Sequence, residues 1–351
     1  MADAPVPREA IRKMAPYVPP TGGRHGKLRL DFNENTVGCS PRVIDLLRRK
    51  ATADWLSVYP DYAEPKMVLA RHFGVSVDQF ALANGTDEAI QLFLNTYVDD
   101  LQEVVLLRPS YAMYRFYAEL AGASLKEVDY RPPQLEFPLA DLFDAIRPRT
   151  GAVIVSNPNN PTGTGIGPSA IEQILAKASG VPVLFDEAYF EFHGVTALPL
   201  LDRYPNLFVS RTFSKCYGMA AMRIGCLFSS VGNVAFLRKA QSPYSVNSLA
   251  VMAAAEAVQD QEYVRRFVAE VLEAREMLCA ALDDMSIAYV PSAANFVLIY
   301  AGARAREVCD SLREKAILVR DRSYEIPGGV RITAGTREQT QRVIDELKRI
   351  W

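Results

Sequence analysis

Short apolar runs alternate with helix-like stretches between residues 80 and 229, and this alternation constrains the fold more than any other feature of the sequence. It is typical of an α/β domain in which a mostly parallel sheet is flanked by helices. Runs that are apolar throughout suit strands that are covered on both faces. Seven strands are expected, at residues 80–84, 103–107, 124–128, 151–156, 181–186, 206–210 and 224–229. Helices are expected at residues 41–51, 86–98, 111–121, 139–146 and 168–178.

The pattern changes after residue 229. A long helical stretch at 246–282 precedes short apolar runs at 295–300, 316–320 and 330–333, with helix-like segments at 303–315 and 337–350. We therefore expect a large domain at residues 41–245 and a smaller α+β domain at residues 246–351. Residues 1–40 are expected to form an N-terminal arm and part of the small domain. A cleft between two domains is a common place for a small-molecule site.

The composition argues against several classes of partner. The chain has 39 basic and 41 acidic residues, so it lacks the basic surplus of a nucleic-acid-binding protein. Five cysteines without a Cys-x-x-Cys pair and three scattered histidines favour neither a disulfide framework nor a metal site. No signal-peptide core and no run of about 18 apolar residues is present, so we expect a cytoplasmic enzyme without a membrane partner.

Lys215 is the first candidate for chemistry, in the segment SRTFSKCYGMAAMRIG at 210–225. A lysine at a strand end among small and hydroxylated side chains can lose hydration, which lowers its pKa. Only a neutral amine attacks a carbonyl, so this setting suits a Schiff-base lysine. Thr212, Ser214 and Arg223 could hold a phosphate beside the amine, which points to pyridoxal phosphate as a cofactor. A solvated surface lysine is the alternative reading.

The segment ANGTDEAI at 83–90 is a second candidate for phosphate binding. A strand ends there, Gly85 turns the chain, and Thr86 and Asp87 open a helix. Free backbone N–H groups and the helix dipole attract anions at such a place. This signal is weak by itself, because many helices open in the same way.

The segment FDEAY at 185–189 ends another expected strand. Asp186 and Glu187 are adjacent, so their side chains point to opposite faces and do not make the paired carboxylates of a glycosidase. Asp186 alone could keep a pyridinium nitrogen protonated. Tyr189 and Asn160 could donate hydrogen bonds to a ring oxygen, and Tyr111 could stack on a planar ring. Turn formation and core packing are the alternative roles for these residues.

Arg331 lies within an apolar strand pattern at 329–336. A buried charge is costly unless it is paired. Arg331 could therefore make a bidentate contact with a substrate carboxylate, or it could form a salt bridge with an Asp or Glu of the chain.

These segments occur in the order YPD, NGTDE, SYAMY, NNPTG, DEAY, SKxxGMAxxRIG and VRIT. Their order resembles that of the pyridoxal-phosphate-dependent aminotransferases of the aspartate aminotransferase fold (fold type I, class I/II). Within that group the sequence is most similar to the histidinol-phosphate aminotransferases, through the opening MAPYVPPTGG and LRLDFNEN, the segment SVYPDY, and the pair VRD and VRITAGT. The resemblance extends from about residue 16 to the end.

The resemblance implies a role for each matching residue. Lys215 would form the Schiff base and carry the proton, while Asp186 would pair with the ring nitrogen. Further cofactor contacts would come from Tyr111, Asn160 and Tyr189 at the ring, and from Gly85, Thr86, Asp87, Thr212, Ser214 and Arg223 at the phosphate. Tyr59 would reach the phosphate of the other subunit, which requires a homodimer. Substrate contacts would come from Arg331, Arg320, Arg322, Asn35 and Tyr17.

The implied reaction is amino-group transfer between glutamate and imidazole acetol phosphate, which yields 2-oxoglutarate and histidinol phosphate. Alternatives on the same scaffold are an aromatic amino acid aminotransferase and a phosphothreonine-type decarboxylase. A catalytically inactive binding protein is a further alternative, against which intact Lys215 and Asp186 argue. The family often has Pro-aromatic-Gly after NEN, whereas this chain has Thr36-Val37-Gly38.

Overall fold

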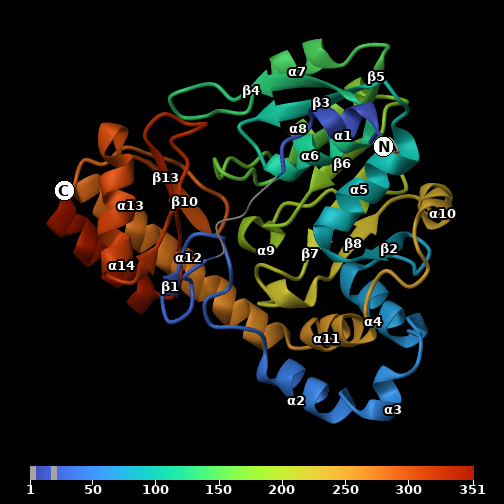
Figure 1. Ribbon diagram of the computed structural model, residues 1–351, viewed down its shortest axis with the longest axis horizontal. Coiled ribbons are helices and arrows are strands. Elements are labelled where there is room, and N and C mark those ends of the chain that lie inside the picture. The colour runs from blue at the N-terminus through green and yellow to red at the C-terminus, as the bar shows by residue number, and fades with distance from the viewer. Residues whose placement is uncertain (1–4, 17–21) are drawn as a thin grey trace, which may run out of the picture.

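Seven strands form the central sheet of the computed structural model, which describes residues 5–16 and 22–351. Their spatial order is β2-β8-β7-β6-β5-β3-β4 (Figure 1). The strands are β2 (Phe80–Ala83), β3 (Glu103–Arg108), β4 (Ser124–Asp129), β5 (Thr150–Ser156), β6 (Val183–Asp186), β7 (Leu207–Thr212) and β8 (Gly225–Phe228). Only β8 runs antiparallel, to both of its neighbours. All seven predicted strands and the mostly parallel α/β sheet are confirmed.

Helices cover both faces of this sheet. Alternate residues along β5 belong to two different apolar clusters, with Val153 and Val155 in one and Ala152 and Ile154 in the other. This division follows from the two-residue period of a strand. One face is covered by α5 (Gly85–Tyr97), α6 (Ala112–Ala121) and α10 (Val231–Ala240), and the other by α7 (Leu139–Ala145), α8 (Pro168–Lys177), α4 (Ala63–Phe73) and α11 (Ser248–Ala257). The central strands are therefore buried on both sides, as their composition predicted.

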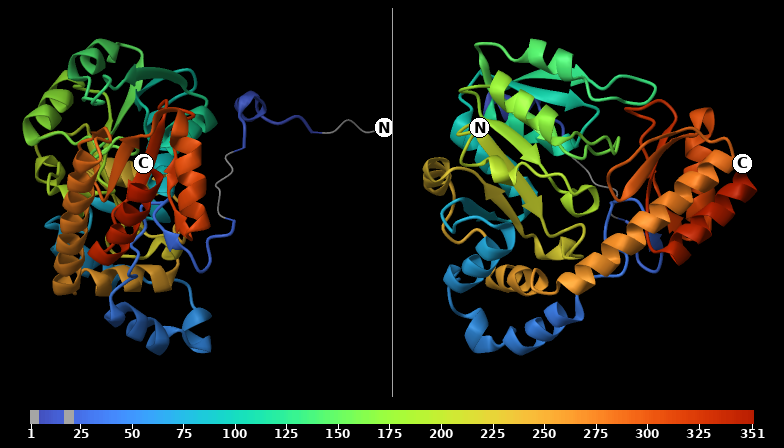
Figure 2. Two further views of the ribbon diagram at one scale, coloured as in Figure 1. Left: turned by 90° about the vertical axis from the view of Figure 1, so that its left-hand side faces the viewer. Right: turned by 180° about the vertical axis from the view of Figure 1, so that it is seen from behind.

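A second, four-stranded sheet in the order β12-β13-β10-β9 lies beside the first (Figure 2). Its strands are β9 (Tyr289–Val290), β10 (Phe296–Tyr300), β12 (Arg320–Asp321) and β13 (Gly329–Thr333). Helices α12 (Gln261–Asp284), α13 (Ala305–Glu314) and α14 (Arg337–Ile350) contribute to a separate apolar cluster with it. The N-terminal strand β1 (Leu28–Arg29) pairs in parallel with β11 (Ile317–Leu318) on the same side of the molecule. The predicted α+β character of this part is confirmed.

Helices α4 and α10 were not expected from the sequence, and two expected elements are each divided in the structure. The stretch 246–282 is not one helix but two, α11 and α12, because Asp260 interrupts it and caps α12 by accepting a hydrogen bond from the Tyr263 N–H. The run 316–320 divides into β11 and β12, which pair with different partners. The remaining α-helices of the described residues are α1 (Glu9–Lys13), α2 (Pro41–Lys50), α3 (Ala53–Leu56) and α9 (Phe190–His193).

Candidate active site

A cavity of about 480 Å³ lies at the carboxyl ends of the central strands. Ser156, Asp186 and Thr212 end β5, β6 and β7, and all three line it. Ligands of open α/β sheets bind at this edge because the loops that follow parallel strands meet there. Of the residues singled out from the sequence, the cavity is lined by Thr86, Asp87, Tyr111, Asn160, Asp186, Tyr189, Thr212, Ser214, Lys215 and Arg223.

Lys215 enters this cavity from the loop that follows β7. Its Nζ donates a hydrogen bond to the backbone oxygen of Phe32 at 2.9 Å and lies 6.0 Å from the centre of the Tyr189 ring. Burial and, to a lesser extent, the charge of Arg331 lower the pKa of Lys215 from 10.5 to about 8. A substantial fraction of the amine is therefore neutral slightly above neutral pH, as a carbonyl-attacking lysine requires.

Asp186 is the buried carboxylate of the cavity. Its Oδ2 accepts a hydrogen bond from the Tyr114 hydroxyl at 2.6 Å, and its Oδ1 accepts one from the Ala188 N–H at 3.2 Å. Burial raises the pKa of Asp186, and these hydrogen bonds act in the opposite direction. The neighbouring Glu187 points away and forms a buried ion pair with Arg211 at 2.7 Å. The prediction that Asp186 and Glu187 serve opposite faces is confirmed.

One end of the cavity has the features of a phosphate cradle. Helix α5 begins at Gly85, so its first backbone N–H groups are free to bind an anion. Gly85 has φ +78°, and a Cβ at this position would lie 2.4 Å from Nη2 of Arg223. Arg223 is paired with Asp87 at 3.2 Å, and the hydroxyl-bearing Ser214 lines the same cavity. A guanidinium, a hydroxyl and a helix N-terminus at one place fit a bound phosphate group.

Other residues of the cavity are suited to a planar ring. The Tyr189 hydroxyl oxygen accepts a hydrogen bond from Asn33 Nδ2 at 2.8 Å, so its own proton remains available to a ligand. Asn160 Oδ1 accepts from Arg331 Nη1, which leaves the Asn160 amide N–H groups as donors. The Tyr111 hydroxyl donates to Asp87 Oδ1 at 3.0 Å, which fixes the ring of Tyr111 at the cavity wall.

Two residues in this region were missed by the sequence reasoning. Tyr114 lies in the first turn of α6, three positions after Tyr111, which is the N-cap residue of this helix. Asn33 lies two residues before Asn35 in the segment DFNEN and has φ +56°, a left-handed conformation that asparagine tolerates. Neither the spacing nor the composition indicated which polar group each of them contacts.

Three arginines lie together on the four-stranded sheet. Arg331 on β13 is opposite Arg320 on β12, and Arg322 follows two residues later. Arg331 is buried and donates to the backbone oxygen of Asp31 at 2.5 Å and to Asn160, while its Nε has no partner. Burial lowers the pKa of Arg331 to about 10. No Asp or Glu of the described residues forms an ion pair with it, so the salt-bridge alternative is not observed. Arg322 is paired with Glu325.

Several of the expected contact residues do not line the cavity. They include Gly85, Arg320, Arg322 and Arg331, and Arg320 lines a separate hollow of about 340 Å³. Three further residues lie elsewhere or outside the described chain. Asn35 is fully engaged in shaping a turn: its Nδ2 donates to the Cys216 oxygen at 2.8 Å, and its Oδ1 accepts from the Val37 and Gly38 N–H groups. Tyr59 is 76% exposed and does not line the cavity. Tyr17 belongs to the segment 17–21, which lies outside the described residues.

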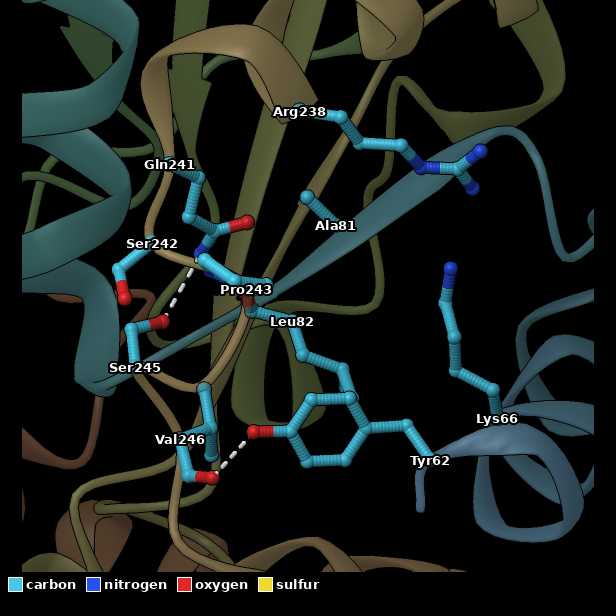
Figure 3. Close-up of a pocket in the computed structure, with 10 residues that line it drawn as sticks. All are labelled: Tyr62, Lys66, Ala81, Leu82, Arg238, Gln241, Ser242, Pro243, Ser245 and Val246. Carbon is cyan, nitrogen blue, oxygen red and sulfur yellow. Dashed lines mark hydrogen bonds between the residues drawn. The ribbon is translucent and has the colours of Figure 1, made fainter. Parts of the chain in front are cut away.

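A second hollow of about 280 Å³ lies between α4, β2 and the loop after α10 (Figure 3). Lys66 extends into it beside Arg238, and burial lowers the pKa of Lys66 to about 8. Its Nζ donates to the Val77 backbone oxygen at 2.8 Å. None of the residues that line this hollow lines the first cavity. A lowered lysine pKa therefore does not locate the site by itself; the facing carboxylate and the phosphate cradle around Lys215 do.

The fold and this cavity define an aminotransferase of fold type I. The chain belongs to the aminotransferase class I and II family, whose sequence model matches residues 25–347. Within the family it is similar to the histidinol-phosphate aminotransferase of Symbiobacterium thermophilum, with 36% identity over 97% of each chain. It is also similar to that of Geobacillus thermodenitrificans, with 34% identity over 97% of this chain and 96% of the other.

Solved structures agree with this assignment. The histidinol-phosphate aminotransferase of Sinorhizobium meliloti, in complex with pyridoxal 5'-phosphate, superposes with a TM-score of 0.86, 25% identity and 98% coverage of both chains. A mutant of Thermus thermophilus aspartate aminotransferase superposes with a TM-score of 0.84 at 22% identity, over 99% of this chain and 100% of the other. The similarity to aspartate aminotransferase shows that the two proteins share a fold. The expected aspartate aminotransferase-like architecture is therefore confirmed.

Proposed function

We propose that this chain is a pyridoxal-phosphate-dependent aminotransferase that moves an amino group from glutamate to imidazole acetol phosphate, with 2-oxoglutarate and histidinol phosphate as products. One observation carries the chemistry: Lys215 and Asp186 line the same cavity, with a phosphate cradle at one end. The choice of substrate is supported by the curated relatives, which are named histidinol-phosphate aminotransferases at 32–36% identity over most of the chain.

Pyridoxal phosphate fits the residues present. Its phosphate would occupy the end formed by Gly85, Thr86, Asp87, Ser214 and Arg223, together with Thr212. Its ring would lie against Tyr111, between the polar groups of Asn160, Tyr189 and Asp186. When bound, the cofactor supplies an aldehyde that bonds to amines and a ring that withdraws electrons.

Three residues of the cavity would have separate roles in the reaction. Asp186 would hold a proton at the ring nitrogen, and Tyr189 would donate its hydroxyl proton to the ring oxygen because Asn33 already donates to the Tyr189 oxygen. Lys215 Nζ would provide the amine that holds the cofactor. The same Nζ would take a proton from the substrate and return it, a role that suits a base with a pKa of about 8.

Substrate anions would be held by the arginines of the four-stranded sheet. The unpartnered Nε of buried Arg331 is a donor that a glutamate carboxylate satisfies. Arg320 and Arg322 lie next to it and would receive either the second carboxylate of glutamate or the phosphate of histidinol phosphate. Asn35 would act indirectly, through the turn behind Lys215 to which its amide donates. A substrate contact by Tyr17 stays a prediction.

A homodimer is part of the proposal. Leu56, Val58 and Tyr59 are all exposed by more than half, and Tyr59 contacts exposed Tyr244 with ring centres 4.7 Å apart. Exposed apolar patches of this kind mark interaction surfaces. Tyr59 would reach from this surface to the cofactor phosphate of the partner subunit.

The location and the domain boundaries belong to the proposal as well. Across the described ranges, every helix is too short or too polar to cross a membrane. A cytoplasmic location is supported by the biosynthetic relatives, whose bacterial sources are named above. We keep residues 41–245 as the cofactor-binding domain, 246–351 as the small domain, and 1–40 as the arm and part of the small domain.

Single-turnover absorbance measurements on the cofactor-loaded enzyme test the substrate assignment. Histidinol phosphate and glutamate should each convert the bound cofactor to its amino form within one turnover, and phenylalanine should not. Fast conversion by phenylalanine alone would make the chain an aromatic aminotransferase. Release of carbon dioxide from phosphothreonine would make it a decarboxylase.

A further inference from the structure

Tyr114 on α6 is a buried residue that contacts the carboxylate of the proposed cofactor site. It is 2% exposed, and its hydroxyl donates to Asp186 Oδ2 at 2.6 Å. Its side chain lines the same cavity as Asp186 and Lys215. The bond joins the first turn of a helix on one face of the sheet to the last residue of β6.

A tyrosine hydroxyl can be buried in this protein without a hydrogen-bond partner. Tyr130 is also 2% exposed, and its hydroxyl has no hydrogen-bond partner among the described residues. Asp186, by contrast, receives one hydrogen bond on each oxygen, from Ala188 N–H on Oδ1 and from Tyr114 on Oδ2. These two hydrogen bonds fix the orientation of the Asp186 carboxylate at the cavity.

We propose that Tyr114 is a positioning residue that keeps Asp186 as a carboxylate and thereby leaves the shared proton on the ring nitrogen of the cofactor. The inference rests on the proposed cofactor site. A hydrogen bond to a carboxylate stabilises its charged form and makes its oxygen a weaker base. Without it, a buried Asp186 competes more strongly for the proton, and a ring without that proton withdraws electrons less well.

Two further observations support this role. Burial and the nearby charge of Asp186 raise the pKa of Tyr114 well above its ordinary value, so its hydroxyl stays protonated and remains a donor. The ring of Tyr114 also packs edge-on against Tyr111, with ring centres 5.6 Å apart at 85°. Phenylalanine at position 114 keeps this packing and removes only the hydroxyl, so the two contributions can be separated.

The experiment compares Tyr114→Phe with the matched control Tyr130→Phe, both loaded with pyridoxal phosphate. The main readout is the NMR chemical shift of an isotopically labelled ring nitrogen, followed against pH. In Tyr114→Phe the protonated fraction of the nitrogen at neutral pH should be smaller than in the wild type, because more of the shared proton lies on Asp186, and kcat should fall about tenfold while KM for glutamate changes less than about twofold. Tyr130→Phe should behave as the wild type does in both measurements.

A fluorotyrosine at position 114 provides a second variant that retains the hydroxyl. Its more acidic hydroxyl is a stronger donor, so the protonated fraction of the nitrogen at neutral pH should be at least as large as in the wild type. Identical nitrogen titrations in the wild type, Tyr114→Phe and the fluorotyrosine variant would overturn the inference. A wild-type ring nitrogen that carries no proton, matching Asp186→Asn, would instead contradict the proposed role of Asp186 itself, so the two failures are distinguishable.

Discussion

Lys215 Nζ is hydrogen-bonded to the backbone oxygen of Phe32, a residue 183 positions earlier in the chain. The next residue, Asn33, donates to the Tyr189 hydroxyl oxygen at 2.8 Å. The N-terminal segment thus holds both the amine and a ring-side hydroxyl of the proposed site. Because β1 just before it pairs with β11, this segment also connects the cavity to the side of the molecule that carries the three arginines.

The first prediction concerns the pH dependence of cofactor capture. Burial lowers the pKa of Lys215 to about 8, so the neutral, reactive fraction grows as pH rises and saturates above that value. The rate at which the cofactor-free protein captures pyridoxal phosphate should rise about tenfold per pH unit below pH 8 and level off above it. Stopped-flow absorbance measures this rate. Lys66→Met should keep the profile, and a rate that continues to climb to pH 10.5 would contradict the lowered pKa.

Gly85 provides the second prediction. A Cβ there would lie 2.4 Å from Arg223 Nη2, and φ +78° strains any residue with a side chain. Gly85→Ala should destabilise the protein by about 1–3 kcal/mol and weaken pyridoxal phosphate binding at least about tenfold. The matched control is Gly232→Ala in α10, where nothing lies within 4 Å of the added Cβ. Calorimetric melting and equilibrium dialysis of the cofactor measure the two effects, and unchanged cofactor affinity in Gly85→Ala would refute the cradle.

The buried ion pair of Arg211 and Glu187 leads to a stability prediction. Their side chains are 4% and 0% exposed, and Arg211 also lies over the Phe190 ring at 3.5 Å. Arg211→Met leaves Glu187 charged and unpaired, which should lower the free energy of unfolding by about 3–5 kcal/mol. The double variant Arg211→Met with Glu187→Gln should recover most of this loss. Urea unfolding measures all three proteins, and a single-variant loss below about 1 kcal/mol would show that the pair is not needed.

Arg331 leads to a prediction about substrate affinity. Arg331→Lys keeps the charge but loses the forked donors that match a carboxylate. KM for glutamate should rise about 10- to 100-fold, with a smaller effect on kcat. Arg306→Lys, an exposed arginine of α13, serves as the control and should leave both constants unchanged. Steady-state kinetics with glutamate measure KM and kcat for both variants. Equal KM values in the two variants would contradict the proposed role of Arg331.

The sheet could be predicted from the sequence because each of its strands is a separate short apolar run. β5, for example, is buried at every position, so its composition alone indicates a strand covered on both faces. The break between α11 and α12 could not be predicted in the same way. Asp260 caps α12 while also accepting a hydrogen bond from Ser40, a residue 220 positions away, and such a contact leaves no local pattern.

The site was partly predictable for a similar reason. Lys215, Asp186 and Gly85 follow strands whose ends meet at one edge of the sheet, so their convergence follows from topology. Tyr114 and Asn33 each act through one hydrogen bond to a residue far away in sequence, 72 and 156 positions respectively. Side-chain partners of this kind depend on the packing of whole elements, and a single sequence does not encode them in a local motif.

Borohydride reduction of the pyridoxal-phosphate-loaded protein, followed by peptide mass mapping, tests the central claim most directly. The account predicts a reduced cofactor adduct on Lys215 and complete loss of that adduct in Lys215→Ala. An adduct on Lys66 or on another lysine, with Lys215 unmodified, would contradict the proposed site.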